Sequence, residues 1–317
     1  MKHALRTASF AALLAGILAA CAPETAPATE TAATPETPAA PAIAAIPASA
    51  DVHPFPIGEL QAAALRDGGM DVPNDNKTLA INKTKADVEA VLAANNLPTD
   101  KLSLSIQPLV VKTTDKVLLF DAGAASAFGP AGGKLPTSMA TAGITPESIT
   151  DVFISHAHGD HVAGLVKADG TLAFPNAAIH ISANEWAAMK GDTQAAALVT
   201  AITPKVVEFQ PGAELIPGTV TAVDIKGHTP GHSGYTITSG DQSLLYIGDT
   251  MHHSVISVQQ PDWTIAFDGD APTAQASRKA LLESAAGSGQ RVYAVHFPFP
   301  GLGKFTKNGD TTVWTAE

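Results

Sequence analysis

The hydrophobic pattern of the chain alternates between strand-like and helix-like segments from about residue 100 onward. Short runs of branched and aliphatic residues that end at Gly, Asp, Ser or a charged residue are typical of buried strands. Such runs occur at 102–106, 117–123, 151–154, 178–181, 220–225, 235–238, 243–247 and 292–296. Segments rich in helix-forming residues predict helices at 138–142, 184–190, 193–200 and 272–286. This pattern predicts a domain of mixed α and β structure.

The first residues have the pattern of a targeting segment. Lys2 and Arg6 precede an apolar run at 8–20, which is too short to be a comfortable membrane span. The run ends in Leu-Ala-Ala-Cys21, which resembles a bacterial lipoprotein signal box. We therefore expect residues 1–21 to be a lipoprotein signal peptide with a lipidated Cys21, so that the protein is periplasmic and anchored to a bacterial membrane. The alternative is ordinary secretory cleavage that leaves a free thiol, and it also implies export.

Residues 22–50 consist almost wholly of Ala, Pro, Thr and Glu. Because such a segment has no apolar face to bury, it is expected to be a semi-extended tether. Residues 51–317 are then long enough for one domain with a substantial core. Cys21 is the only cysteine, which excludes an internal disulfide and a cysteine ligand elsewhere in the chain.

The chain is acidic, with a formal net charge of −11 at pH 7. Removal of residues 1–20 takes away Lys2 and Arg6 and no acid, which makes the charge −13. An acidic surface argues against nucleic acid and against electrostatic docking on anionic lipid. We therefore expect a small-molecule substrate, and contact with a membrane only through the lipid anchor.

The most informative stretch is Ser155-His156-Ala157-His158-Gly159-Asp160-His161, which follows a predicted buried strand. Two histidines two positions apart can direct both imidazoles to one cation, and the following Asp and His can serve a second cation. Imidazole and carboxylate ligands suit zinc, and also manganese, cobalt or iron. The alternative is a solvated polar loop, but so many clustered histidines with a carboxylate favour a metal site.

Two further stretches carry similar chemistry. Gly227-His228-Thr229-Pro230-Gly231-His232 forms a tight turn that can direct His232 inward. Two strands end close to a polar group, one at Gly248-Asp249 and the other at His296. A charged group at the end of an apolar strand is costly unless it is paired or binds a metal.

These motifs, in this order, resemble the metallo-β-lactamase superfamily over about residues 100–317. The resemblance implies a four-layer αββα sandwich, an α+β fold with the metals at one rim between two sheets. It assigns His156, His158 and His232 to one metal ion, and Asp160, His161 and His296 to the other. Asp249 would bridge both ions, and His228 would be a turn residue or a support for a ligand.

Some stretches more closely resemble methyl parathion hydrolase-like enzymes. They are Phe128-Gly129-Pro130, Ala173-Phe174-Pro175-Asn176-Ala177, Phe267-Asp268-Gly269-Asp270 and His296-Phe297-Pro298-Phe299-Pro300-Gly301-Leu302-Gly303. This subgroup implies an aromatic pocket, for which Phe128, Trp186 and Phe299 are candidate walls, and a homodimer. Plain core packing is the alternative role for each of these rings.

The remaining histidines give weaker signals. His252 and His253 follow Asp249 closely, so one of them is expected near the site and the other in solvent. His180 lies in an apolar strand and is expected to be a core residue with a hydrogen-bond partner. His53 has no assigned role.

These observations predict a hydrolase that binds two divalent metal ions. Zinc is the expected metal, and Mn²⁺, Co²⁺ or Fe²⁺ are the alternatives. A hydroxide held between the ions would cleave an ester, a lactone or a phosphotriester, with Asp249 and Asp160 as catalytic residues. True β-lactamases generally lack the aspartate that corresponds to Asp249, so the resemblance points mainly to esters, lactones or phosphotriesters, and a β-lactamase is an alternative. A thioesterase or glyoxalase-like hydrolase, and a non-catalytic metal-binding lipoprotein, are the others.

Overall fold

The computed structural model describes residues 45–317. The expected signal peptide, Cys21 and most of the tether lie outside the described residues, and export and lipidation stay predictions. Within 45–317, no helix combines the length and the apolarity that crossing a membrane requires. Ile46 is buried among core residues, so the packed part of the chain begins before the expected boundary at residue 51.

The first sheet has seven strands in the order β1-β2-β5-β6-β7-β8-β9. Their bounds are β1 Val52–Ile57, β2 Leu60–Leu65, β5 Leu109–Lys112, β6 Val117–Phe120, β7 Asp151–Phe153, β8 Ala178–Ser182 and β9 Val206–Phe209. The strands from β1 to β6 pair antiparallel, and those from β6 to β9 pair parallel. Parallel neighbours need crossover segments, and these carry most of the helices of this half.

The second sheet has seven strands in sequence order from β10 to β16. Their bounds are β10 Glu214–Ile216, β11 Val220–Asp224, β12 Ser233–Ser239, β13 Gln242–Tyr246, β14 Arg291–Tyr293, β15 Leu302–Asn308 and β16 Thr311–Ala316. Only β13 and β14 pair parallel, and the long helix α7, Ala271–Ser288, lies in the crossover between them. The carboxyl ends of β11, β13 and β14 therefore point the same way.

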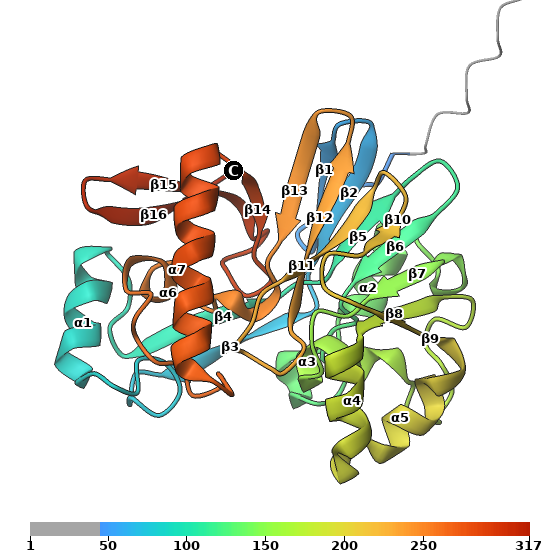
Figure 1. Ribbon diagram of the computed structural model, residues 1–317, viewed down its shortest axis with the longest axis horizontal. Coiled ribbons are helices and arrows are strands. Elements are labelled where there is room, and N and C mark those ends of the chain that lie inside the picture. Colours follow the sequence, from blue (N-terminus) through green and yellow to red (C-terminus); the bar gives the residue numbers. More distant parts are fainter. Residues whose placement is uncertain (1–44) are drawn as a thin grey trace, which may run out of the picture. The chain divides into compact units, whose positions relative to one another are not determined.

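The two sheets pack face to face with helices outside, which confirms the expected αββα sandwich (Figure 1). The core between the sheets is aromatic, with Tyr235, Tyr246 and Tyr293 fully buried beside Phe120 and Phe153. The outer face of the first sheet is covered by α2, Leu135–Thr141, α4, Ala183–Gly191, and α5, Ala196–Ile202. Helix α7 covers the outer face of the second sheet.

A small additional unit, of which only the strand at 102–106 was predicted from the sequence, lies between residues 68 and 106. It consists of the hairpin-like pair β3, Gly68–Pro73, and β4, Lys101–Ile106, with α1, Lys85–Ala94, between them. It packs with Trp263 and the short helix α6, Ile256–Gln259, in a separate apolar cluster. Asn95 and Gln259 exchange two amide hydrogen bonds of 3.1 and 2.7 Å across the contact between α1 and α6.

A buried ionic network closes the amino-terminal end of β7. Asp151 accepts hydrogen bonds from His180 Nε2 at 2.9 Å and from Lys116 Nζ at 2.9 Å. The His180 ring stacks on Phe153, with the centroids 4.7 Å apart, which confirms that His180 is a core residue. Burial acts to raise the pKa of Asp151, but the hydrogen bonds from His180, Lys116 and Thr150 outweigh it and hold that pKa well below its ordinary value.

Replacement of Asp151 by Asn should lower the free energy of unfolding by about 2 kcal/mol at pH 7, because it leaves the buried His180 and the partly buried Lys116 without a charged acceptor. A carboxylate with a depressed pKa stabilises the fold above its unfolded pKa, and this stabilisation decreases as the pH falls. The difference between the wild type and Asp151→Asn should therefore be smaller at pH 3 than at pH 7 in denaturant unfolding. An equal difference at both pH values would contradict this account.

Candidate metal centre

The polar residues of interest lie on segments that follow strand ends of both sheets. His156 and His158 follow β7, and the short helix α3, Gly159–Val162, carries Asp160 and His161. Asp160 and His161 lie in the first turn of α3. His228 follows β11, Asp249 follows β13 and His296 follows β14. Because β11, β13 and β14 run in the same direction, their carboxyl ends bring distant segments to one edge.

The side chains form a first group around His228. Its Nε2 lies 3.2 Å from His156 Nε2 and 3.1 Å from His158 Nδ1. Asp249 Oδ2 lies 3.4 Å from His228 Nε2 and 3.6 Å from His156 Nε2. Donor atoms roughly 3.3 Å apart are what a tetrahedral ion with bonds of about 2.0–2.1 Å requires. The four donors therefore have the spacing of a metal site.

A second group adjoins the first through Asp249. Asp160 Oδ2 lies 3.6 Å from His161 Nε2 and 3.4 Å from His296 Nε2. Asp249 Oδ1 lies 3.2 Å from His161 Nε2 and 3.0 Å from His296 Nε2. Asp249 Oδ2 also lies 3.2 Å from His296 Nε2, so this one carboxylate contacts nitrogens of both groups.

Several of these atoms are buried without a hydrogen-bond partner. Among the described residues, His161 Nε2, Asp249 Oδ1 and both ring nitrogens of His252 are in this state. His252 Nε2 lies 3.1 Å from Asp249 Oδ2, but the contact lacks hydrogen-bond geometry. A buried polar atom without a partner is costly, and cations between the donors would satisfy His161 Nε2 and Asp249 Oδ1. His252 also lies within ligand distance of Asp249 and His296. The donor set and the unpaired atoms fit a pair of divalent cations.

The charges of the two groups favour added positive charge. Burial acts to raise the pKa of Asp249, but the neighbouring histidines outweigh it and hold that pKa well below its ordinary value. Burial lowers the pKa of His156 and His158, so that their imidazoles are neutral at pH 7. Burial also acts to lower the pKa of His296, yet Asp249 and Asp160 raise it overall. Burial likewise acts to lower the pKa of His161, but Asp249, Asp160 and Asp121 outweigh it and raise that pKa well above its ordinary value. A cation in the second group would replace the protons that His161 and His296 otherwise hold.

Asp121 fixes His161 directly and His156 through Ser155. Its carboxylate accepts hydrogen bonds from His161 Nδ1 at 2.6 Å, Ser155 Oγ at 2.7 Å and Tyr246 Oη at 2.6 Å. The Ser155 hydroxyl lies 3.1 Å from His156 Nδ1 and, since it donates to Asp121, can accept a hydrogen bond from the Nδ1–H of His156. Both histidines then present Nε2 to the site. Asp121 adopts a left-handed conformation, φ 59°, at the end of β6 to reach them.

Glu185 at the start of α4 connects two of the ligand-bearing loops. Its carboxylate accepts hydrogen bonds from Ala157 N at 2.8 Å, Thr229 Oγ1 at 2.7 Å and Gly231 N at 2.9 Å. Gly231 is so close that a β-carbon there would lie 2.2 Å from Glu185 N. Glu185 was not singled out from the sequence, where it is one acid in a predicted helix.

His296 is held by the small additional unit. Its Nδ1 donates to Ser105 O at 2.7 Å, and Ser105 N donates to His296 O at 3.0 Å. The Gln107 amide donates to Ala294 O at 3.0 Å and to Phe297 O at 2.9 Å, which fixes the loop that bears His296. The end of β4 thus directs His296 Nε2 toward Asp249.

Comparison with known proteins agrees with this geometry. The family model of the metallo-beta-lactamase superfamily matches residues 106–296. The chain belongs to the metallo-β-lactamase superfamily. No match was found among curated proteins.

Several solved structures are similar to this chain. AidC, described as a dizinc quorum-quenching lactonase in complex with a product, is 30% identical with a TM-score of 0.79, over 84% of this chain and 97% of AidC. The hydrolase AbOPH is 27% identical with a TM-score of 0.75, over 86% of this chain and 99% of its own. A probable metal-dependent hydrolase from Staphylococcus aureus, 20% identical with a TM-score of 0.70 over 83% and 99%, shares the fold. The methyl parathion hydrolase-like subgroup stays a prediction.

The positions of His228 and His232 are the reverse of those expected. His232 Nδ1 donates to Ile225 O at 2.9 Å, and its Nε2 accepts the Asp249 backbone N–H at 2.9 Å. Burial lowers the pKa of His232 to about 4, which agrees with a neutral ring that accepts at Nε2. With both nitrogens occupied by backbone groups, His232 supports Asp249 and lies outside the metal-binding group. In this member of the metallo-β-lactamase superfamily, His228 takes the expected place of His232.

The three expected aromatic pocket walls have different surroundings. Trp186 is buried in the core between α4 and the first sheet, so it does not form a pocket wall. Phe299 packs at the edge of the core between the sheets, and the Arg66 guanidinium lies 4.1 Å from its ring centroid. Phe128 is 37% exposed and lies beside Gly159. Only Phe128 combines exposure with a position next to the metal-binding loop.

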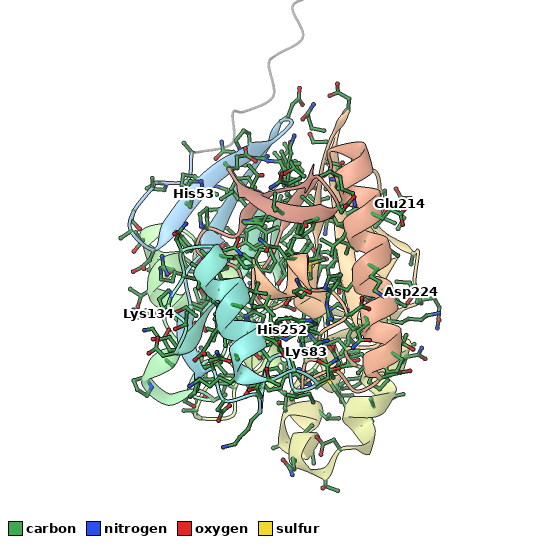
Figure 2. The ribbon with its side chains drawn as sticks, turned by 90° about the vertical axis from the view of Figure 1, so that its left-hand side faces the viewer. His53, Lys83, Lys134, Glu214, Asp224 and His252 are labelled. Carbon is green, nitrogen blue, oxygen red and sulfur yellow. The ribbon has the colours of Figure 1, made fainter. Side chains whose placement is uncertain are left out.

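The other histidines also have defined places. His252 is buried between His228 and His296, with ring centroids 5.2 and 5.4 Å away, and is labelled in Figure 2. His253 was expected in solvent if His252 was near the site, but it is buried, and its Nδ1 accepts the backbone N–H groups of Val255 and Ile256. His53, on β1, lies well away from His252 (Figure 2).

Replacement of Gly248 by Ala should disturb the support of Asp249. A β-carbon there would lie 2.6 Å from His232 Nε2, at a φ of +48° that disfavours any side chain. Gly240→Ala is a matched control, because Gly240 has a φ of +60° with nothing within 4 Å. We expect Gly248→Ala to lower the free energy of unfolding by about 1–3 kcal/mol more than Gly240→Ala, as measured by denaturant unfolding. Equal losses would mean that backbone strain alone matters.

Proposed function

We propose that this protein is a hydrolase that holds two divalent cations and cleaves carboxylic esters, with lactones as its preferred class. The observation that carries the proposal is the Asp249 carboxylate, which lies within 3.6 Å of nitrogens from both groups of histidines. The similarity to AidC, a dizinc lactonase at 30% identity, supports the lactone class.

The residues divide into two sets of ligands. His156, His158 and His228 would hold the first cation, and Asp160, His161 and His296 the second, with Asp249 shared. Three nitrogen donors with one carboxylate oxygen favour zinc in the first site. The site is not a closed structural one, because the Asp160 side chain is 10% exposed and His158 is only partly buried. A substrate can therefore reach the donors.

When bound, the cations supply the Lewis acidity that makes water a nucleophile at neutral pH and stabilises negative charge on the substrate oxygen. Asp160 is the more accessible of the two carboxylates, with 10% of its side chain exposed against 3% for Asp249. We assign Asp160 the proton of the attacking water, which it would return to the leaving oxygen. Asp249 stays ionised and holds both groups of histidines together.

His252 is placed to contact the substrate. Its ring is buried, neither nitrogen has a hydrogen-bond partner, and Phe267, an exposed ring, lies 5.7 Å away. Burial lowers the pKa of His252, so that it is neutral at pH 7 and can donate one N–H to a carbonyl oxygen.

Metal analysis with a substrate panel tests the proposed function. We expect about two zinc ions per folded chain, turnover of acyl-homoserine lactones and p-nitrophenyl esters, and loss of that activity with a chelator and its recovery with zinc. Folded protein without bound transition metal, or fully loaded protein without turnover of any ester, would refute it. Faster turnover of methyl parathion would indicate a phosphotriesterase, and turnover of nitrocefin alone a β-lactamase.

Paired alanine variants test the exchange of His228 and His232. We expect His228→Ala to lose about one of the two zinc ions and at least roughly 100-fold in kcat/KM, because a ligand is removed. His232→Ala should keep both ions and lose about 2 kcal/mol of unfolding free energy, because the Asp249 N–H loses its acceptor. Elemental analysis and denaturant unfolding distinguish the two. The opposite result would restore the assignment made from the sequence.

A further inference from the structure

Asp268 is a buried carboxylate between α6 and α7 that belongs to neither set of ligands. Its side chain is 0% exposed. It accepts from His228 Nδ1 at 3.0 Å with one oxygen and from Arg278 Nη2 at 2.9 Å with the other. A buried carboxylate is stable only with such partners, so the pair of contacts is required wherever Asp268 is ionised.

Arg278 also donates to two backbone carbonyl groups. It lies on α7, fully buried, and donates through Nε to Thr250 O at 2.8 Å and through Nη1 to Pro261 O at 3.1 Å. Thr250 is the residue after Asp249. One guanidinium therefore connects the carboxylate beside His228 with the segment that carries Asp249.

The backbone of the same segment also holds His228. Gly269 N donates to His228 O at 2.9 Å, and Asp270 N donates to Gly227 O at 2.9 Å, where α7 begins. With Nδ1–H donated to Asp268, the lone pair of His228 is at Nε2, which lies 3.2 Å from His156 Nε2. Both the position and the tautomer of His228 thus depend on the residues that precede α7.

We propose that Asp268, anchored by Arg278, is the positioning residue of the first metal site, which it serves by holding His228 with Nε2 directed at the cation. This inference rests on the proposed function, because it requires that a cation binds there. It is specific to the first site, since His161 in the second group has its own carboxylate, Asp121, at 2.6 Å. Removal of Asp268 should therefore weaken one cation and spare the other.

The test is a zinc competition titration of the full folded chain with a chromophoric chelator, for the wild type and Asp268→Asn. Asn keeps the shape of the side chain but removes the charge that orients His228. We expect one of the two zinc ions to bind about 10–100-fold more weakly and the other to be unchanged, as is usual when the carboxylate behind a histidine ligand is removed. In cobalt-loaded protein, the visible absorption of one ion should change.

Asp151→Asn is the matched control, because Asp151 also pairs with a buried histidine and a cation, His180 and Lys116, but has no contact with the ligand groups. It should lower stability and leave both zinc affinities unchanged. A loss of zinc affinity in Asp151→Asn equal to that in Asp268→Asn would overturn the inference, since general destabilisation would explain both.

Unchanged binding of both ions in Asp268→Asn would also overturn the inference. Should Asp268→Asn fail to fold, Asp268→Glu takes its place, because it keeps the charge beside Arg278 and displaces the carboxylate by one methylene. One zinc ion should again bind more weakly, because the displaced carboxylate cannot hold His228 in the same position. Unchanged binding of both ions in Asp268→Glu would overturn the inference. Failure of the wild type to bind zinc would instead refute the proposed function, so the two failures are distinguishable.

Discussion

The structure depends on the burial of negative charge where two sheets meet. Asp249 is 2% exposed, and Asp160 and Asp121 are also buried around the same histidines. Carboxylates removed from water need cations or hydrogen bonds close by, or they take up protons. Five imidazoles place a ring nitrogen within 3.6 Å of an Asp249 carboxylate oxygen, those of His156, His161, His228, His252 and His296. His232 accepts the backbone N–H of Asp249. The imidazoles around the Asp249 carboxylate form a set of donors that metal ions complete.

A set of supports outside the ligand groups maintains this geometry. Asp121 holds His161, Ser105 O holds His296, Asp268 holds His228, and Glu185 joins the loops of His158 and His228. Each support comes from a different segment: Asp121 follows β6, Ser105 lies on β4, Asp268 precedes α7 and Glu185 lies on α4. The precision of the site is therefore a property of the whole sandwich, because loosening of one layer moves a single ligand relative to the others.

Strand direction explains why residues so far apart in sequence meet. The parallel pairing of β13 with β14 requires the crossover that contains α7, and this crossover brings Asp268 and Arg278 against His228. The same pairing sets Asp249 and His296 on neighbouring strand ends. The ligand groups and the helix that anchors them are thus consequences of one topological feature.

The sequence by itself determined the alternation of strands and helices, the family and most of the ligand candidates, because these rest on local spacing. The His156 to His161 motif, Gly248-Asp249 and His296 each follow a recognisable strand, and a strand end fixes where a side chain lies. The choice between His228 and His232 was decided only by the tertiary structure. Both lie in one tight turn, and only the partners Ile225 O, Asp249 N and Asp268 distinguish them. Glu185, Asp268 and Trp186 were missed or misplaced for the same reason, since burial and pairing between distant segments leave no periodic signal in the chain.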